Sequence, residues 1–213
     1  PEAAVLERAL PAERGVASVA SEAAREGAQV IGRDGAPKEI VFVDAGVTDW
    51  QKLVANAKPG LEVVVLDPTR DGLTQIAETL AGRSGLDAIH VISHGGDGTL
   101  ILGGKDVDQA ALAAHQGDLQ KIGQALSTNG DILLYGCDIA KGTAGAAFVD
   151  AVAKATSADV AASTDATGSA VKRGDWDLEY AAGKIDVAPV IRAADVTSYN
   201  GLLASMTLAL DKN

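Results

Sequence analysis

The chain has 213 residues, of which 47 % are hydrophobic and only 3 % aromatic, and it carries a formal net charge of −11. This length fits one compact domain with extensions, and the scarcity of aromatic side chains predicts a core of valine, isoleucine, leucine and alanine, as in a parallel sheet covered by helices. The negative charge argues against nucleic acid and anionic membrane as partners, and no apolar run approaches the roughly 20 residues of a membrane span.

Residues 1–38 are predicted to be a leader or pro-segment. They are rich in alanine, glutamate and arginine, and they end in the turn-forming stretch GRDGAPK. We expect this segment to be either weakly helical or disordered. The start, PEAAVLERAL, is acidic and lacks the apolar core of a signal peptide.

From residue 39 on, apolar runs that indicate buried strands alternate with helical patterns. The strands are expected within EIVFVDAG, LEVVVLD, LDAIHVIS, DILLYG and ADVAAS, and the helices around residues 50–57, 73–80, 119–126 and 144–155. A hairpin-like TLILGG follows the third strand, and WDLEYA and KIDV are expected to be short edge strands. This alternation predicts an α/β fold with a right-handed, mostly parallel sheet. We place the domain at residues 39–190 and a C-terminal extension at residues 191–213.

Residues that could take part in catalysis or binding follow three of the expected strands. Asp44 ends the first strand, His94 and Gly95 follow the third, and Cys137 follows the fourth. Open parallel sheets bind ligands beyond the carboxyl ends of their strands, so His94 and Cys137 are expected to lie near each other. An imidazole beside a thiol helps to form a thiolate, and the backbone N–H groups of Gly95 and Cys137 could form an oxyanion hole. The alternative is that Cys137, the only cysteine, is an inert packing residue at a strand end.

Metal and cofactor sites have little support in the sequence. His90 lies on an expected strand and His115 in a polar stretch, so with one cysteine no zinc site is expected. Surface carboxylates are compatible with weak calcium binding. We therefore expect no cofactor, with calcium left open.

Four motifs carry a resemblance to a known family. The stretches VISHGGDGTLILGG, DILLYGCDIA, DVAAST and GDWDLEY resemble the caspase-like domain known as domain of unknown function 4347 over about residues 39–187. This resemblance implies a caspase-like three-layer sandwich with helices on both faces of the sheet. It also implies kinship with the clan CD cysteine peptidases, in which His94 would match the catalytic histidine, Cys137 the nucleophile and Gly95 an oxyanion donor.

The resemblance implies hydrolysis of a peptide bond in a peptide or protein substrate. Caspases receive an acidic side chain with an arginine after the first strand, where this chain has Asp44, so an acidic pocket would favour arginine or lysine at the cleaved position. The alternative is that Asp44 and the other acidic candidates, Asp138 and Asp165, cap helices or turns. The candidate substrate-binding residues are Asp44, Tyr135, Asp138, Ser163, Thr164 and Asp165, with Ser163 and Thr164 expected to pair with an extended peptide.

Two further functions stay open beside the peptidase. One is a catalytically silent module that serves secretion, anchoring or adhesion of a large surface protein, which is the setting that the resemblance implies and which would place the chain outside the cell or on its surface. The other is a transferase or hydrolase that uses the same dyad on a non-peptide acyl group. The substrate could be the chain itself, because arginines in the leader and Arg192 offer sites for self-processing.

Overall fold

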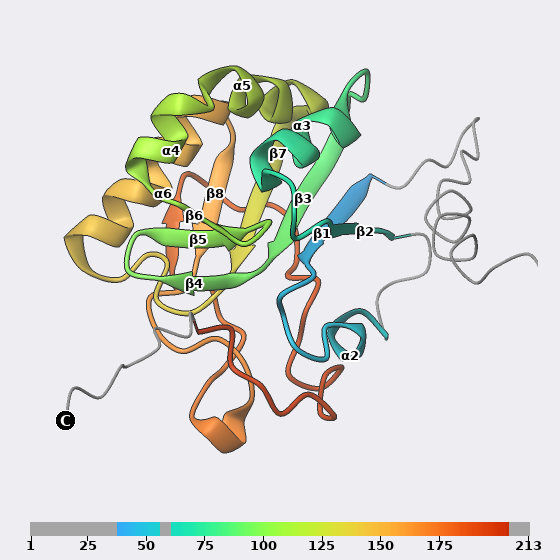
Figure 1. Ribbon diagram of the computed structural model, residues 1–213, viewed down its shortest axis with the longest axis vertical. Coiled ribbons are helices and arrows are strands. Elements are labelled where there is room, and N and C mark those ends of the chain that lie inside the picture. The colour runs from blue at the N-terminus through green and yellow to red at the C-terminus, as the bar shows by residue number, and fades with distance from the viewer. Residues whose placement is uncertain (1–37, 56–60, 205–213) are drawn as a thin grey trace, which may run out of the picture. The chain divides into compact units, whose positions relative to one another are not determined.

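The computed structural model describes residues 38–55 and 61–204. Its main sheet has six strands in the order β2-β1-β3-β7-β8-β9, of which the first five are parallel and the last is antiparallel (Figure 1). The inner strands are almost continuous buried apolar runs, as a parallel sheet covered on both faces requires. The strands are β1 (Glu39–Asp44), β2 (Glu62–Leu66), β3 (Leu86–Ile92), β7 (Leu126–Tyr135), β8 (Asp159–Ala162) and β9 (Tyr180–Ala182).

Strands β3 and β7 are direct neighbours in the sheet, with Ile92 opposite Tyr135. Because parallel strands end at the same edge, the residues that follow these two strands meet there. The chain leaves β3 through Ser93 into a small antiparallel sheet, whose first strand begins at His94. Its strands are β4 (His94–Gly96), β5 (Thr99–Leu102) and β6 (Lys105–Val107).

Four helices cover one face of the main sheet, and a large apolar cluster lies between them and the strands (Figure 1). Two of them begin at aspartates whose side chains accept backbone N–H groups of the first turn: Asp71 accepts from Thr74, and Asp108 accepts from Ala111. The helices are α3 (Gly72–Leu80), α4 (Gln109–Ala114), α5 (Gln116–Ala125) and α6 (Gly142–Thr156). Among the described residues, no helix is long and apolar enough to span a membrane.

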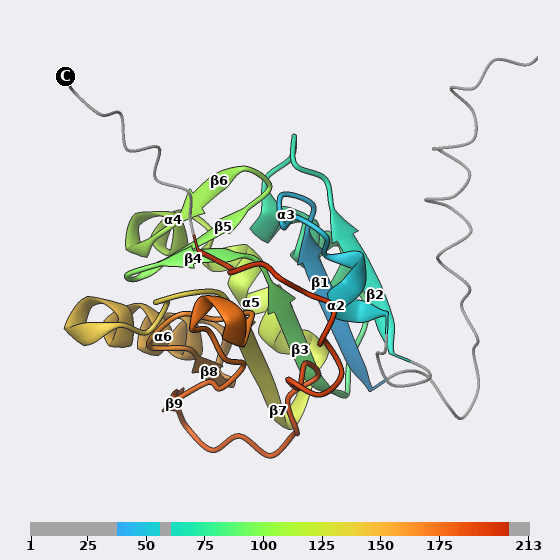
Figure 2. The same cartoon turned by 90° about the horizontal axis from the view of Figure 1, so that it is seen from below.

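The opposite face is covered by the single-turn helix α2 (Gln51–Val54) and by irregular chain from the C-terminal part (Figure 2). This chain runs from the 3-10 turn η1 (Ala170–Lys172) and β9 to residue 204. Four of its side chains are buried against the sheet: Ile191, Val196, Tyr199 and Leu203. Through these four side chains, residues 191–204, which the sequence placed in an extension, contact the core of the domain.

Some predicted elements differ from the structure. The expected strand KIDV does not form, because the backbone N–H groups of Asp186 and Val187 donate to the buried carboxylate of Asp131 instead of to a neighbouring strand. Of WDLEYA only the end is a strand, in β9. The helix expected around residues 50–57 is the short α2, and its predicted end lies outside the described residues. The predicted leader, residues 1–38, also lies outside them except for its last residue.

Candidate active site

His94 stands at the edge of the main sheet where β3 ends. Its ring nitrogen Nε2 lies 3.2 Å from the carbonyl oxygen of Gly46, in the loop after β1. Its other ring nitrogen, Nδ1, is buried and has no hydrogen-bond partner within the described part of the chain. A buried imidazole nitrogen without a partner is available to exchange a proton with a group that enters the site.

Cys137 follows β7 at the same edge, and its side chain is only 1 % exposed. The thiol lies between backbone groups of Thr167: Sγ is 3.4 Å from the carbonyl oxygen and 3.2 Å from the amide nitrogen. Burial raises the pKa of this thiol, and the negative charges of Asp138 and Asp165 raise it further, while the backbone N–H groups of Thr167 and Leu203 oppose the rise. The thiol is therefore covered by the surrounding chain, and its burial favours the protonated form.

Gly95 brings its backbone unusually close to Cys137. A Cβ atom at position 95 would lie 2.8 Å from the carbonyl oxygen of Cys137, so a side chain there would push the two strand ends apart. At this close approach, two backbone N–H groups point toward the same carbonyl oxygen. The N–H of Gly95 and the N–H of Cys137 both donate to the carbonyl oxygen of Leu203, at 2.9 and 3.0 Å. Two backbone donors that converge on one carbonyl oxygen are the arrangement of an oxyanion hole.

The residues that carry this carbonyl form an extended stretch, Asn200–Ala204, which we call the C-terminal segment. On one side the N–H of Leu203 donates to the carbonyl of Thr167 at 2.9 Å, and the N–H of Ser169 donates to the carbonyl of Gly201 at 2.9 Å. On the other side Gly95 pairs with Ala204 as an isolated parallel bridge. The C-terminal segment is thus held between the loop after β8 and the start of β4.

Sequence reasoning did not find the residues of this contact: Thr167, Gly168, Ser169 and Leu203. The only signal was weak, an apolar pair in the stretch NGLLAS within the predicted C-terminal extension. Gly168 matters because its φ is +141° and a Cβ there would lie 2.5 Å from the carbonyl oxygen of Gly201. Only glycine lets the C-terminal segment approach the loop this closely.

Two residues expected in the substrate pocket are engaged in the protein interior. Asp44 is 2 % exposed, and its two carboxylate oxygens accept the N–H groups of Gly46 at 2.8 Å and Gly103 at 2.6 Å. Tyr135 is fully buried, and its hydroxyl accepts the N–H of Val190 at 3.0 Å. Burial is the main cause that raises the pKa of Tyr135, so its hydroxyl stays protonated. Asp44 orders two loops at the sheet edge, and Tyr135 fixes the chain that covers the sheet.

The two residues expected to pair with an extended peptide have other partners. The buried hydroxyl of Ser163 donates to the carbonyl of Asp165, and its carbonyl accepts the N–H of Ala140. The backbone N–H of Thr164 donates to the carboxylate of Glu179 at 2.7 Å. The backbone that pairs with an extended segment lies a few residues further along the same loop.

Asp138 and Asp165 lie beside the site without entering it. The carboxylate of Asp138 pairs with Lys141 at 2.9 Å, and the backbone N–H of Asp138 donates to the carbonyl of Asp165 at 2.7 Å. Asp165 is exposed and forms an acidic cluster with Asp175 and Glu179, whose carboxylate oxygens lie within 4.8 Å of one another. Oxygen atoms at this spacing could share a cation such as calcium.

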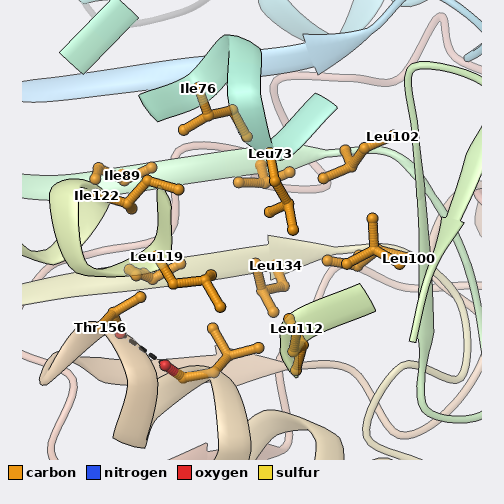
Figure 3. A pocket seen from close by; sticks show the side chains of 14 residues that line it. Leu73, Ile76, Ile89, Leu100, Leu102, Leu112, Leu119, Ile122, Leu134 and Thr156 are labelled. Atoms are coloured by element: carbon orange, nitrogen blue, oxygen red, sulfur yellow. Dashed lines mark hydrogen bonds between the residues drawn. The ribbon is translucent and has the colours of Figure 1, made fainter. Parts of the chain in front are cut away.

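Away from this edge, a small cavity of about 30 Å³ lies between the main sheet and the helices α3, α4, α5 and α6 (Figure 3). Its lining is apolar except for Thr156, whose hydroxyl donates to the carbonyl of Val152 at 2.8 Å. The Thr156 hydroxyl is the one polar side-chain group among the residues that line this cavity, so the cavity is suited to apolar contacts.

Comparison with known proteins adds one finding. Residues 40–203 match the model of a family described as "Domain of unknown function (DUF4347)". The match covers more than half of the chain, includes both candidate catalytic residues and ends at Leu203. No curated protein matches the chain.

Proposed function

The chain belongs to the DUF4347 family, and from this premise we propose that it is a cysteine peptidase of the caspase-like type in which His94 and Cys137 form the catalytic dyad. One observation supports the proposal above all others: the N–H groups of Gly95 and Cys137 both donate to the carbonyl oxygen of Leu203. Two backbone N–H groups from adjacent strand ends that converge on one peptide carbonyl are what the proposed reaction needs to hold the oxyanion, and one of them belongs to Cys137 itself.

The proposed reaction uses the dyad in two steps. His94 accepts the thiol proton of Cys137, and the sulfur forms a bond with the carbonyl carbon while the negative charge on its oxygen is held by the two N–H groups. His94 then gives the proton to the leaving amine, and the C–N bond breaks to leave a thioester. Water, which loses a proton to His94, attacks the thioester carbon, and the C–S bond breaks to restore the thiol.

The resemblance of the motifs extends the proposal to fold and setting. The parallel sheet with helices on one face and α2 on the other is compatible with a caspase-like three-layer arrangement. The setting that follows from this resemblance is a large bacterial surface or adhesin-type protein, in which a peptidase domain would process the chain that carries it.

A basic residue at the cleaved position, as the sequence predicts, gains no support from two of the three candidate acids, Asp44 and Asp138. The carboxylate of Asp44 already accepts two backbone N–H groups, and that of Asp138 pairs with Lys141. A guanidinium or ammonium group would therefore enter without a free buried partner, which is unfavourable.

A second function has one specific observation in its favour. The thiol of Cys137 is buried with a raised pKa, as is typical of a cysteine that only packs. A catalytically silent module that serves anchoring or adhesion does not need an accessible thiol, so this burial is compatible with it. A peptidase must instead expose the thiol to its substrate or hold the substrate in place already.

Labelling with a peptide that carries a thiol-reactive acyloxymethyl ketone separates the two functions. We expect the full chain to be labelled at Cys137, and labelling to fall at least about 100-fold in His94→Ala, because the imidazole supplies the proton transfer. His115→Ala is the matched control, since this histidine lies at the start of α5, where its ring nitrogen Nδ1 is 3.2 Å from the carboxylate of Asp118. Labelling that is unchanged by His94→Ala would indicate an ordinary thiol and would support the silent module.

A further inference from the structure

The C-terminal segment has the hydrogen-bonding pattern of a bound substrate strand. Its backbone pairs antiparallel with the loop after β8, with the N–H of Leu203 donating to Thr167, the N–H of Ser169 donating to Gly201, and Leu202 bridging to Gly168. Peptides that add to a sheet edge are held by such main-chain bonds. The chain therefore places five of its own residues in the position where an extended peptide would bind.

Within this segment the carbonyl of Leu203 is singled out. It accepts the N–H groups of Gly95 and Cys137, which come from two different strand ends. The carbonyl of Thr167 accepts from the Leu203 N–H and lies 3.4 Å from the thiol sulfur, so one oxygen joins the nucleophile to the segment. Two donors on one carbonyl oxygen polarise its carbon toward attack, and the bond that follows this carbonyl is Leu203–Ala204.

The side chain of Leu203 is bound as specifically as its backbone. It is 0 % exposed and belongs to the buried apolar cluster that contains Tyr135, Cys137, Trp176 and Tyr199. Because the Leu203 side chain is fully buried among apolar side chains, an apolar side chain of leucine size fits there, and a charged one would lose its hydration. The neighbouring Leu202 is only half-buried, which leaves Leu203 as the anchored residue.

We propose that the domain cleaves its own chain at the Leu203–Ala204 bond, and that its substrate class is an extended peptide with leucine at the cleaved position. This inference rests on the proposed peptidase function and adds the bond and the specificity to it. The thiol of Cys137 adds to the carbonyl carbon of Leu203, the amine of Ala204 leaves with the proton that His94 has taken from the thiol, and water hydrolyses the thioester to the Leu203 carboxylate.

The intact mass of the purified full chain tests the proposal directly. During incubation we expect the wild type to lose residues 204–213 and the released peptide to begin at Ala204, while Cys137→Ala and His94→Ala keep their full mass. Leu203→Lys separates the two views of specificity. If charge directed cleavage, this variant would be cut at least as fast as the wild type, whereas the apolar pocket predicts that it is cut at least about 100-fold more slowly.

Two variants control for loss of packing. Leu203→Met keeps an apolar side chain of similar volume, so we expect cleavage within about 10-fold of the wild type. Ile122→Ala removes a buried aliphatic side chain from the helical face, outside the apolar cluster that holds Leu203, and it should be cut at the wild-type rate if it is folded. Equal slowing of Ile122→Ala and Leu203→Lys would assign the effect to folding and overturn the specificity.

The remaining outcomes distinguish this inference from the function on which it rests. A Leu203–Ala204 bond that stays intact while Cys137 is still labelled in a His94-dependent manner overturns self-cleavage at this bond and keeps the peptidase. An intact bond together with labelling that ignores His94 overturns both. A cut that persists in Cys137→Ala comes from a contaminating peptidase and also overturns the inference.

Discussion

The two faces of the central sheet are covered by different kinds of structure. On one face, α3, α5 and α6 bury an almost entirely aliphatic cluster against the strands. On the other face, one turn of helix and an irregular chain do the same work, with both tryptophans and two of the three tyrosines gathered there: Trp50, Trp176, Tyr135 and Tyr199. The first face is covered by helices, which have their own internal backbone hydrogen bonds. The second is covered mostly by irregular chain, which is fixed by its contacts with the rest of the domain.

This difference separates stability from function. The C-terminal segment is fixed by backbone hydrogen bonds to two loops and by contacts such as the tilted ring pair of Trp176 and Tyr199, whose centroids are 5.8 Å apart. We expect that this segment can be cut without unfolding the sheet, because the apolar cluster under the helices is formed without it. Mutations on the helical face should therefore change stability, and mutations at the covered edge should change chemistry.

The largest expected effect on chemistry with little effect on stability is that of a mutation at His94. His94→Ala should lower the rate of self-cleavage by about 100- to 10,000-fold, because general acid–base catalysis contributes that much. It should cost less than about 1 kcal/mol of the free energy of unfolding, because the ring makes one hydrogen bond, to Gly46. Intact mass against time and urea unfolding measure the two effects. A large loss of stability with little change in rate would make His94 a packing residue.

The opposite result, a large effect on stability and none on the rate of cleavage, is expected for Phe148 on the helical face. This side chain is fully buried in the aliphatic cluster. Phe148→Ala should lower the free energy of unfolding by about 3–5 kcal/mol through the cavity it leaves, and the folded protein should be cleaved at the wild-type rate. Val171→Ala is the control, since this side chain is 87 % exposed and should change stability by less than about 0.5 kcal/mol. A folded Phe148→Ala that no longer cuts itself would show that the faces are coupled.

The sequence predicts the helical face well because its elements are periodic. The strands of the parallel sheet are apolar runs, and the helices repeat apolar residues on one side, so the order of elements and the adjacency of β3 and β7 follow from local pattern. The strand expected at KIDV is wrong for a reason that local pattern does not contain. Its N–H groups are taken by Asp131, which is 55 residues away or more along the chain.

The candidate site divides in the same way. The strand-end rule predicts from sequence that Gly95 and Cys137 meet, as their backbones do, because the rule depends only on which strands are neighbours. The partners of Leu203 depend instead on where an irregular chain of about 20 residues returns to the sheet, and no periodicity encodes that path. Asp44 shows the same limit, since its position at a strand end fits a pocket acid as well as the loop-ordering role that its contacts with Gly46 and Gly103 reveal.

A milder disturbance of the covered edge is expected at Gly168. Gly168→Ala places a methyl group 2.5 Å from the carbonyl oxygen of Gly201 at a φ of +141°, so the C-terminal segment should be pushed off its loop. We expect a loss of about 1–3 kcal/mol and a faster reaction of Cys137 with a small thiol reagent. Gly117→Ala is the control, because a Cβ there meets nothing within 4 Å. An unchanged thiol reactivity in a folded Gly168→Ala would mean that the segment does not shield Cys137.

The smallest expected effect is a pH dependence that belongs to the covered face alone. Burial raises the pKa of the Cys137 thiol, so the folded state keeps its proton at pH values where the unfolded thiol, with a pKa of about 8.5, has lost it. The free energy of unfolding should then be unaffected below that pH and fall as the pH rises above it. Between about pH 7.5 and 9.5 the free energy of unfolding should fall more steeply in the wild type than in Cys137→Ala. Tyr199, whose pKa burial raises to about 12, adds a fall of the same sign only above about pH 10. Urea unfolding of both proteins at these pH values measures the difference, and equal slopes would mean that the thiol ionises as freely in the folded protein as in the unfolded chain.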